Sequence, residues 1–204
     1  NLMKGAIEMA DKVTTVSPTY AKEILNPWFS HGLDRCLNSK QYKTCGFLNG
    51  IDTDMYNSET DKGIAANFKP GKMAGKKKCR EELLKEANLP QCDVPVMGII
   101  SRLVEHKGFD LIKCVLDDIV CSGIKVVVLG SGEKQYEDFF YYMQNKYPEA
   151  VSFKCGYVPA YAKKIYAGAD MFLMPSKSEP CGLAQMIALR YGTVPIVRAT
   201  GGLK

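Results

Sequence analysis

The sequence predicts an α/β fold built on a Rossmann-like, doubly wound parallel sheet, and three observations predict it. From about residue 95, short apolar runs recur at roughly regular intervals. The runs are rich in Val, Ile and Phe and do not alternate with polar residues, which is typical of strands covered on both faces. Helical stretches separate them, and such alternation is typical of parallel strands joined by right-handed crossovers.

The strands and helices follow each other in order along this part of the chain. Strands are expected at residues 94–100, 125–129, 150–155, 171–174 and 194–197. Helices are expected at residues 109–121, 134–147, 160–169 and 182–191. The helix at 109–121 has one apolar face, which is made by Leu111, Ile112, Val115, Leu116 and Ile119.

The first ninety or so residues lack this regular alternation. The patterns predict a helix from residue 6 that runs into a short strand at 12–16, and then a helix that is capped by Ser17 and ends at Leu25. A loop-like stretch at 26–44 and a strand at 47–52, which ends in a turn, are expected to follow. After them we expect an extended connection at 54–75 and a helix at 79–87. Leu83 and Leu84 set the buried face of that last helix. We therefore expect a domain boundary near residue 45.

The composition narrows the class of protein. With 204 residues, of which 46% are apolar, the chain can build a core, so disorder is not expected. The net charge of +5 is modest. Part of it lies in Lys76-Lys77-Lys78 and Arg80, a cluster that could contact a polyanion but that we interpret as a solvated helix start. No aromatic residues interleave with the basic ones, so a nucleic-acid partner is not expected.

Cysteine usage and hydropathy favour a reducing, aqueous compartment. None of the eight cysteines forms a Cys-x-x-Cys pair, and the two histidines lie far from any cysteine pair, so a metal site has little support. No apolar run approaches the length of a membrane span, and no signal peptide is visible, so no membrane contact is expected. Both ends of the sequence suggest a chain cut from a longer protein.

Five unusual loops follow the five predicted strands. They contain Ser101-Arg102, Gly130-Ser131-Gly132, Gly156-Tyr157, residues 176–182 and Thr200-Gly201-Gly202. Because ligands of open parallel sheets bind where the strands end, these loops predict a binding site on one rim of the sheet.

The loop at 176–183 combines a carboxylate with free backbone N–H groups. Glu179 can accept bonds from sugar hydroxyls, while Cys181, Gly182 and Leu183 offer N–H groups at the start of the next predicted helix, where an anion is favoured. A sugar nucleotide presents both kinds of group. The alternative is that Glu179 only stabilises the helix N-terminus.

Two cations follow the first strand of the predicted sheet. Arg102 and Lys107 can stabilise the charge that develops on a diphosphate leaving group without a metal ion. The alternative is that both are solvated surface cations. We take Arg102, Lys107 and Glu179 as the catalytic candidates.

Four further residues are candidates for substrate binding. Tyr157 could stack on a base or cap the core, and Gly130 lies in a Gly-x-Gly sequence that a plain tight turn explains equally well. Thr200 and Gly201 could approach a phosphate or form an ordinary turn.

Six motifs carry a resemblance to a known family. The chain resembles the bacterial glycogen synthase and plant starch synthase family in Lys12–Tyr20 (KVTTVSPTY), Leu48–Asp52 (LNGID), Ser101-Arg102-Leu103 with Lys107-Gly108, Tyr166–Ser176 (YAGADMFLMPS), Glu179–Leu183 (EPCGL) and Arg190–Val197 (RYGTVPIV). It departs from the pattern at Ala184, where many members have Thr. At Ile187 the broader group has a second Glu, which synthases of this family commonly lack.

The resemblance implies a GT-B fold, in which two Rossmann-like domains flank the active site. It implies retaining transfer of glucose from ADP-glucose to the non-reducing end of an α-1,4-glucan, with no cofactor and no metal. Arg102 and Lys107 would bind the diphosphate, Glu179 the donor glucose, and Tyr157 would lie by the adenine. Residues 1–45 would be the tail of the N-terminal acceptor domain and linker, and 46–204 an incomplete nucleotide-sugar-binding domain.

Several alternatives stay open at this point. Another GT-B transferase could use UDP-glucose, and a non-catalytic Rossmann module could keep the fold without the reaction. A nucleotide-binding oxidoreductase is weakened because no Gly-x-Gly-x-x-Gly follows the first core strand. We expect the parent enzyme in a bacterial cytoplasm or a plastid, and we expect this chain, without the N-terminal domain, to be inactive alone.

Overall fold

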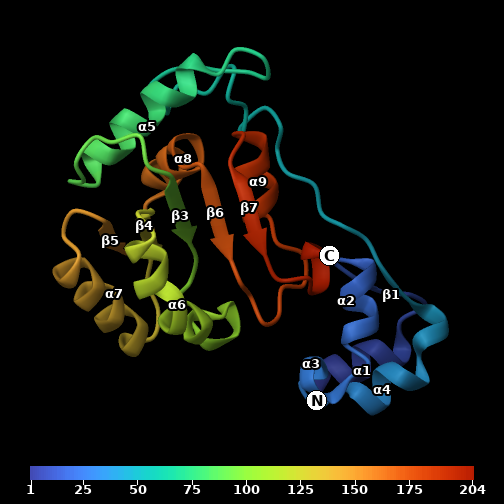
Figure 1. Ribbon diagram of the computed structural model, residues 1–204. Coiled ribbons are helices and arrows are strands. Elements are labelled where there is room, and N and C mark those ends of the chain that lie inside the picture. The colour runs from blue at the N-terminus through green and yellow to red at the C-terminus, as the bar shows by residue number, and fades with distance from the viewer. The chain divides into compact units, whose positions relative to one another are not determined.

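The computed structural model describes residues 1–204, which group into two compact units (Figure 1). Unit 1 comprises Asn1–Gly50, Ser176–Leu183 and Arg198–Lys204. Unit 2 comprises Ile51–Pro175 and Ala184–Val197. This grouping reflects the density of contacts within each unit, and the domain boundary near residue 45 stays a prediction.

Unit 2 contains a five-stranded sheet in which every neighbouring pair is parallel. The strands are β3 (Val96–Ile100), β4 (Lys125–Gly130), β5 (Val151–Cys155), β6 (Met171–Met174) and β7 (Val194–Val197). Their order in the sheet is β5-β4-β3-β6-β7. Because the chain starts in the middle of the sheet and later returns to add strands on the other side, the sheet is doubly wound, and the predicted fold class is confirmed.

The helices of unit 2 alternate with these strands, although the first helix begins at Ala74, before the predicted start at residue 79. They are α5 (Ala74–Glu86), α6 (Phe109–Cys121), α7 (Lys134–Lys146), α8 (Pro159–Gly168) and α9 (Ala184–Arg190), with a 3-10 turn, η2, at Glu105–Lys107. The bounds predicted for α6 are confirmed. The helix predicted from residue 182 begins later, at Ala184, because Gly182 has a φ of +75°, outside the right-handed helical region.

The core of unit 2 lies on both faces of the sheet. Val126 and Val128 of β4 pack against residues of α6 and α7, whereas Val127 and Leu129 of the same strand pack against α5 and α8. Figure 1 shows these helix pairs on opposite sides of the sheet. Successive residues of a strand point to opposite faces, so a strand buried on both faces must be apolar throughout. This explains why the runs do not alternate.

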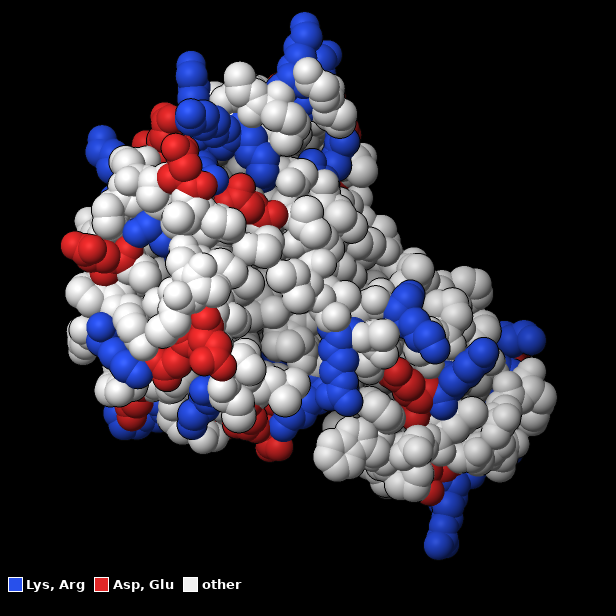
Figure 2. Space-filling model, viewed as in Figure 1, with Lys and Arg blue, Asp and Glu red and all other residues white.

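Lys76, in the first turn of α5, lies mostly buried. Its Nζ donates to the carbonyl oxygens of Ala167 (3.1 Å) and Tyr191 (2.9 Å) and to Oγ1 of Thr193 (2.8 Å). The prediction of a solvated helix start is therefore wrong for Lys76, although Lys77 and Lys78 are exposed. Carbonyls at helix C-termini lack intrahelical partners, and a buried ammonium group satisfies them here. Figure 2 shows basic side chains gathered over α5 and the preceding segment.

Burial should make Lys76 a source of pH-dependent stability. Desolvation lowers the pKa of Lys76 to about 8, and the nearby Asp170 offsets only part of that effect. Between pH 8 and 10.5 the unfolded chain then binds more protons at this site than the folded chain, so stability rises with pH. From pH 7.5 to 9.5 we expect Lys76 to contribute an increase of about 2 kcal/mol in the free energy of unfolding.

Urea unfolding of the wild type and of Lys76→Met at these pH values measures this contribution. The substitution should remove the increase, whereas Lys77→Met, which changes the exposed neighbour, should retain it. An unchanged pH dependence in Lys76→Met would show that the ammonium group is solvated.

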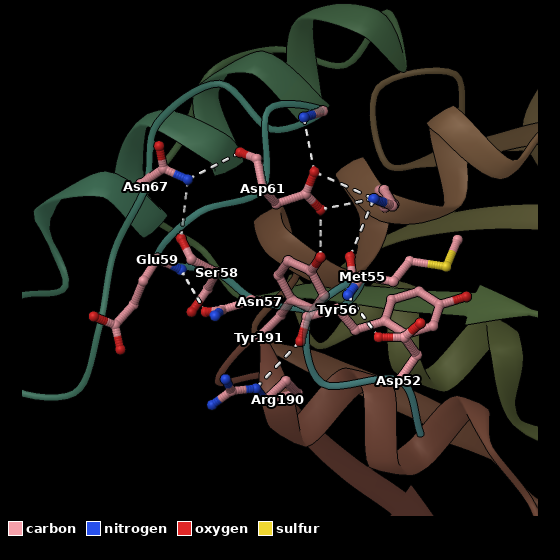
Figure 3. Close-up of polar contacts among 12 residues, drawn as sticks. Asp52, Met55, Tyr56, Asn57, Ser58, Glu59, Asp61, Asn67, Arg190 and Tyr191 are labelled. Carbon is pink, nitrogen blue, oxygen red and sulfur yellow. Dashed lines mark hydrogen bonds and ion pairs between the residues drawn. The ribbon is translucent and has the colours of Figure 1, made fainter. Parts of the chain in front are cut away.

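Asp61 fastens the segment that leads into α5, as Figure 3 shows. Its carboxylate accepts hydrogen bonds from Tyr191 Oη and from the backbone N–H of Gly63 (2.8 Å), and it pairs with Lys163 Nζ (3.1 Å). The segment predicted as an extended connection at 54–75 instead folds into turns, with one isolated bridge between Lys69 and Lys72. Polar contacts to α8 and to the end of α9, rather than pairing with a strand, fix the position of this segment.

Unit 1 is built from short elements around a small core. They are α1 (Leu2–Met9), β1 (Val13–Thr15), α2 (Pro18–Glu23), α3 (Pro27–Ser30), α4 (Asp34–Ser39), η1 (Gln41–Lys43), β2 (Thr44–Gly46) and η3 (Gly201–Leu203). The core contains Ile7, Ile24, Cys36 and Leu37. The predicted cap of α2 is confirmed, because Ser17 Oγ accepts from the backbone N–H of Tyr20 at 2.9 Å.

Two expectations for unit 1 are wrong. Residues 26–44 are not loop-like, since α3 begins behind an Asn26 cap with Pro27 in its first turn, and α4 follows at once. Such short helices leave no long apolar period to detect. The strand predicted at 47–52 lies earlier, at Thr44–Gly46, where it pairs with β1. No helix of the chain is long and apolar enough to span a membrane.

Candidate functional site

The loops after β3 and β4 lie against each other, backbone to backbone. The N–H of Leu103 donates to Ser131 O (2.9 Å), and the N–H of Glu133 donates to Leu103 O (2.7 Å). The loop after β5 joins them, because the N–H of Gly156 donates to Gly130 O (3.1 Å). The carboxyl ends of three adjacent strands thus form one continuous rim in unit 2.

Gly130 permits this close approach. A Cβ atom at this position would lie 2.1 Å from the carbonyl oxygen of Ser101, far inside van der Waals contact. Any side chain here would push the two loops apart. The Gly-x-Gly sequence is therefore required by packing between loops, which the sequence alone could not separate from a plain turn.

A cavity of about 220 Å³ opens at this rim. It is lined by Ile100, Ser101, Arg102, Leu129, Gly130, Ser131, Gly156, Tyr157, Val158, Pro159 and Ala162. Three predicted site residues from the ends of three neighbouring strands, Arg102, Gly130 and Tyr157, are brought together here. Aliphatic walls, an aromatic ring and a cation suit a flat heteroaromatic ring joined to an anionic group.

The polar residues of this rim differ in their exposure to solvent and in the contacts that they make within the chain. Tyr157 is 90% exposed, so it does not cap the core. Arg102 is exposed, and its guanidinium group makes no bond within the chain. Lys107 ends η2 and is half-buried, outside the lining of the cavity. Arg102 and Tyr157 are thus available to a ligand without breaking any contact.

The other predicted site residues belong to unit 1. Glu179 is buried (7% exposed), and its Oε2 accepts a bond from Ser176 Oγ at 3.0 Å. Cys181 is buried, and Leu183 is partly exposed. Gly182 provides the turn between them, with its positive φ. The carboxylate of Glu179 is therefore held inside its loop, and Ser176 fixes its orientation.

Thr200 and Gly201 lie between two glutamates of unit 1. Thr200 Oγ1 and the N–H of Gly201 both donate to Oε1 of Glu23, at 3.1 and 2.9 Å. On the other side, a Cβ atom on Gly201 would lie 1.8 Å from the carbonyl oxygen of Glu179, and Gly201 has a φ of +50°. Only glycine fits at position 201, beside the loop that carries Glu179. Contact of Thr200 or Gly201 with a phosphate stays a prediction.

Sequence reasoning missed Glu23 and gave Ser176 no role. Glu23 ends α2, and its partners lie more than 170 residues away in the chain, so no local motif marks it. Ser176 could have been noticed, because it lies three residues before Glu179 in the same loop. No three His, Cys, Asp or Glu side chains come together as metal ligands.

Two family models match the chain. The model described as "Starch synthase catalytic domain" matches residues 1–39, and the model described as "Glycosyl transferases group 1" matches residues 80–204, which is more than half of the chain.

Curated relatives align along the whole chain. Glycogen synthase from Clostridium acetobutylicum is 51% identical over 205 aligned residues, which cover 100% of this chain and 43% of the relative. Glycogen synthase from Kosmotoga olearia is 50% identical over 204 residues, with the same coverage of 100% and 43%. The chain thus spans less than half of the length of these relatives.

Solved structures share the fold. The catalytic domain of Starch Synthase IV from Arabidopsis thaliana, bound to ADP and acarbose, is 40% identical and superposes with a TM-score of 0.92 over 98% of this chain and 42% of that one. Sucrose-phosphate synthase from Thermosynechococcus elongatus, 21% identical with a TM-score of 0.64 over 100% of this chain and 44% of its own, shows the fold alone. The structure is about half of a GT-B fold. The chain belongs to the glycosyl transferases group 1 family and, within it, to the glycogen and starch synthases.

Proposed function

We propose that this chain binds ADP-glucose as the donor-binding portion of a synthase that transfers glucose to the non-reducing end of an α-1,4-glucan. The observation that carries the proposal is the cavity of unit 2, where Arg102, Gly130 and Tyr157 converge from the ends of three neighbouring strands. A fold of this class binds its ligand at that edge. The family supplies the reaction, and the cavity supplies a place for the nucleotide.

The chemistry of unit 2 suits the nucleotide. Tyr157 presents an exposed ring on which adenine can stack, and the aliphatic wall beside it can cover the other apolar surface of the base. Arg102 and Lys107 provide positive charge for the diphosphate. As the bond from glucose to the diphosphate breaks, negative charge grows on the leaving oxygen, and a cation already in place stabilises it without reorganisation.

The loop of Glu179 in unit 1 suits the sugar. A carboxylate held in place by Ser176 is a hydrogen-bond acceptor of the kind that binds sugar hydroxyl groups. We assign Glu179 to the donor glucose. The Arabidopsis starch synthase was solved with ADP, which supports adenine rather than uracil as the base for this chain too.

Calorimetric titration of the 204-residue chain tests donor binding. We expect ADP and ADP-glucose to bind, UDP-glucose to bind more weakly, and Arg102→Ala with Lys107→Ala to abolish the heat of binding, because the diphosphate then lacks both of its cations. Lys113→Ala with Lys134→Ala removes the same charge from α6 and α7 and serves as the control. Binding of NAD in preference to ADP-glucose would contradict the proposal and favour a dinucleotide-binding module.

The chain alone should bind donor without extending glucan. Transfer needs an acceptor oriented against the donor and water excluded from both, and the chain covers 43% of its curated relatives. Release of ADP with elongation of a glucan primer by the chain alone would contradict this. The compartment, a bacterial cytoplasm or a plastid, remains our expectation from the relatives.

A further inference from the structure

Glu23 makes a contact in unit 1 that the fold of α2 does not require. It is the last residue of α2, a helix that lies beside the C-terminal turn η3 (Figure 1). Its Oε1 accepts two hydrogen bonds, from Thr200 Oγ1 (3.1 Å) and from the backbone N–H of Gly201 (2.9 Å). Glu23 therefore fixes both a side chain and the backbone of this turn.

The same turn, Thr200-Gly201-Gly202, also contacts the backbone of Glu179. The N–H of Gly202 donates to the carbonyl oxygen of Glu179 at 3.0 Å. Gly201 approaches that same carbonyl so closely that even a Cβ atom has no room. The backbone of this turn therefore contacts Glu23 on one side and Glu179 on the other, and no free space separates it from the carbonyl group of Glu179. A displacement of the turn must displace the backbone of Glu179.

Glu23 carries a cost that a structural contact alone would not need. Its second oxygen, Oε2, is shut off from solvent and has no hydrogen-bond partner. A buried acceptor without a partner destabilises a fold, and a neutral acceptor at this position would bind the same two donors at a lower desolvation cost. Bonds to a carboxylate are stronger than bonds to a neutral oxygen. The arrangement therefore holds the turn tightly at the expense of stability.

We propose that Glu23 is a positioning residue for donor transfer: through Thr200 and Gly201 it holds the backbone of Glu179 at the place where the carboxylate meets the sugar. Glu23 acts through the turn and needs no contact with substrate. The inference rests on the proposed role of Glu179 and adds a residue from the N-terminal end of the chain to that site. A misplacement of about 1 Å at a reacting centre can cost on the order of 10²-fold in rate.

The test is steady-state kinetics of the full-length synthase that carries this chain, with ADP-glucose and a glucan primer. We expect Glu23→Ala to lower kcat by on the order of 10–100-fold, while the inhibition constant of ADP stays within about twofold, because the nucleotide residues of unit 2 are unchanged. Glu23→Gln keeps an acceptor for both donors and should restore kcat to within about threefold of the wild type. A role in folding alone would lower the melting temperature and leave kcat per folded enzyme unchanged.

Glu8→Ala is the matched control. Glu8 is also a glutamate of unit 1 that binds groups from another element, Lys40 at 2.9 Å and Cys36 at 3.4 Å, but it touches neither the turn nor Glu179. Its kcat should equal that of the wild type. If Glu23→Ala does not fold, Glu23→Asp retracts the carboxylate by one methylene and should lower kcat by about tenfold.

The outcomes separate the two proposals. A wild-type enzyme that transfers no glucose from ADP-glucose to glucan contradicts the proposed function. An active wild type with a fully active Glu23→Ala contradicts the positioning role of Glu23 and leaves the proposed function standing. Equal loss of kcat in Glu23→Ala and Glu23→Gln would overturn the proposal as well, because charge rather than position would then matter.

Discussion

Asp61→Ala is expected to lower the free energy of unfolding of unit 2 by about 3–5 kcal/mol, the usual cost of removing one partner from a buried ion pair. The side chain of Asp61 is 4% exposed and that of Lys163 is 23% exposed. The substitution removes the acceptor of the Tyr191 hydroxyl (Figure 3) and leaves the Lys163 ammonium with the carbonyl oxygen of Met55, at 3.4 Å, as its remaining acceptor. The buried hydroxyl of Tyr191 then has no acceptor, the Lys163 ammonium loses its counter-charge, and the turns at 54–75 lose this anchor.

Chemical denaturation at neutral pH measures this loss. Asp54→Ala, which changes an exposed aspartate in the same segment, should alter stability by no more than about 0.5 kcal/mol. A loss below about 1 kcal/mol in Asp61→Ala would show that the site is open to water, because exposed ion pairs contribute no more than that.

Acid should weaken the same contact in the wild type. Burial alone would raise the pKa of Asp61, but the bonds from Tyr191, Gly63 and Lys163 outweigh it and hold the pKa below its ordinary value. A carboxyl group whose folded pKa is depressed contributes stability above its unfolded pKa, near 4, and loses that contribution as the pH falls further. Asp61→Ala should therefore flatten the acid limb of the stability profile.

The fold of unit 2 could be predicted from sequence because its signals are local and repeated. In α6, Ile112 and Leu116 lie one helical turn apart on the buried face, and the bounds of that helix followed from this periodicity. Unit 1 offers no such repetition. The pairing of Val13 with Thr44 depends on residues about thirty positions apart, so β2 could not be placed from the residues of the strand alone.

The same limit applies to the candidate site. Arg102 and Tyr157 were found because each follows an apolar strand, and parallel strands bring their carboxyl ends to one edge. Glu23 and Lys76 were missed or misread because their roles depend on partners from distant parts of the chain. A charged residue near a helix end is usually solvated, and only three-dimensional contacts show when it is not.

Arg102→Ala should lower kcat/KM of the full-length synthase for ADP-glucose by on the order of 10²–10³-fold, the range seen when one preorganised group that stabilises transition-state charge is removed. Arg102 lines the cavity of unit 2, and its guanidinium group makes no bond within the chain, so the fold does not depend on it. The melting temperature should therefore stay unchanged while activity falls. This separation of activity from stability is the opposite of what Asp61→Ala should show.

The residual activities of Arg102→Lys and of a control variant, Lys134→Ala, show how the guanidinium group of Arg102 contributes to the rate. Arg102→Lys keeps the charge but loses the planar fork that can bind a diphosphate through two parallel bonds, so it should recover only part of the lost rate. Lys134→Ala removes an exposed cation from α7 and should have no effect.

Full activity in Arg102→Ala would mean that the exposed guanidinium is an ordinary surface group. The positive charge for the leaving diphosphate would then have to come from Lys107 or from elsewhere in the enzyme. A fall in affinity for ADP equal to the fall in kcat/KM would mean that Arg102 binds the nucleotide equally before and during the reaction, whereas a larger fall in kcat/KM would place its contribution in the transition state.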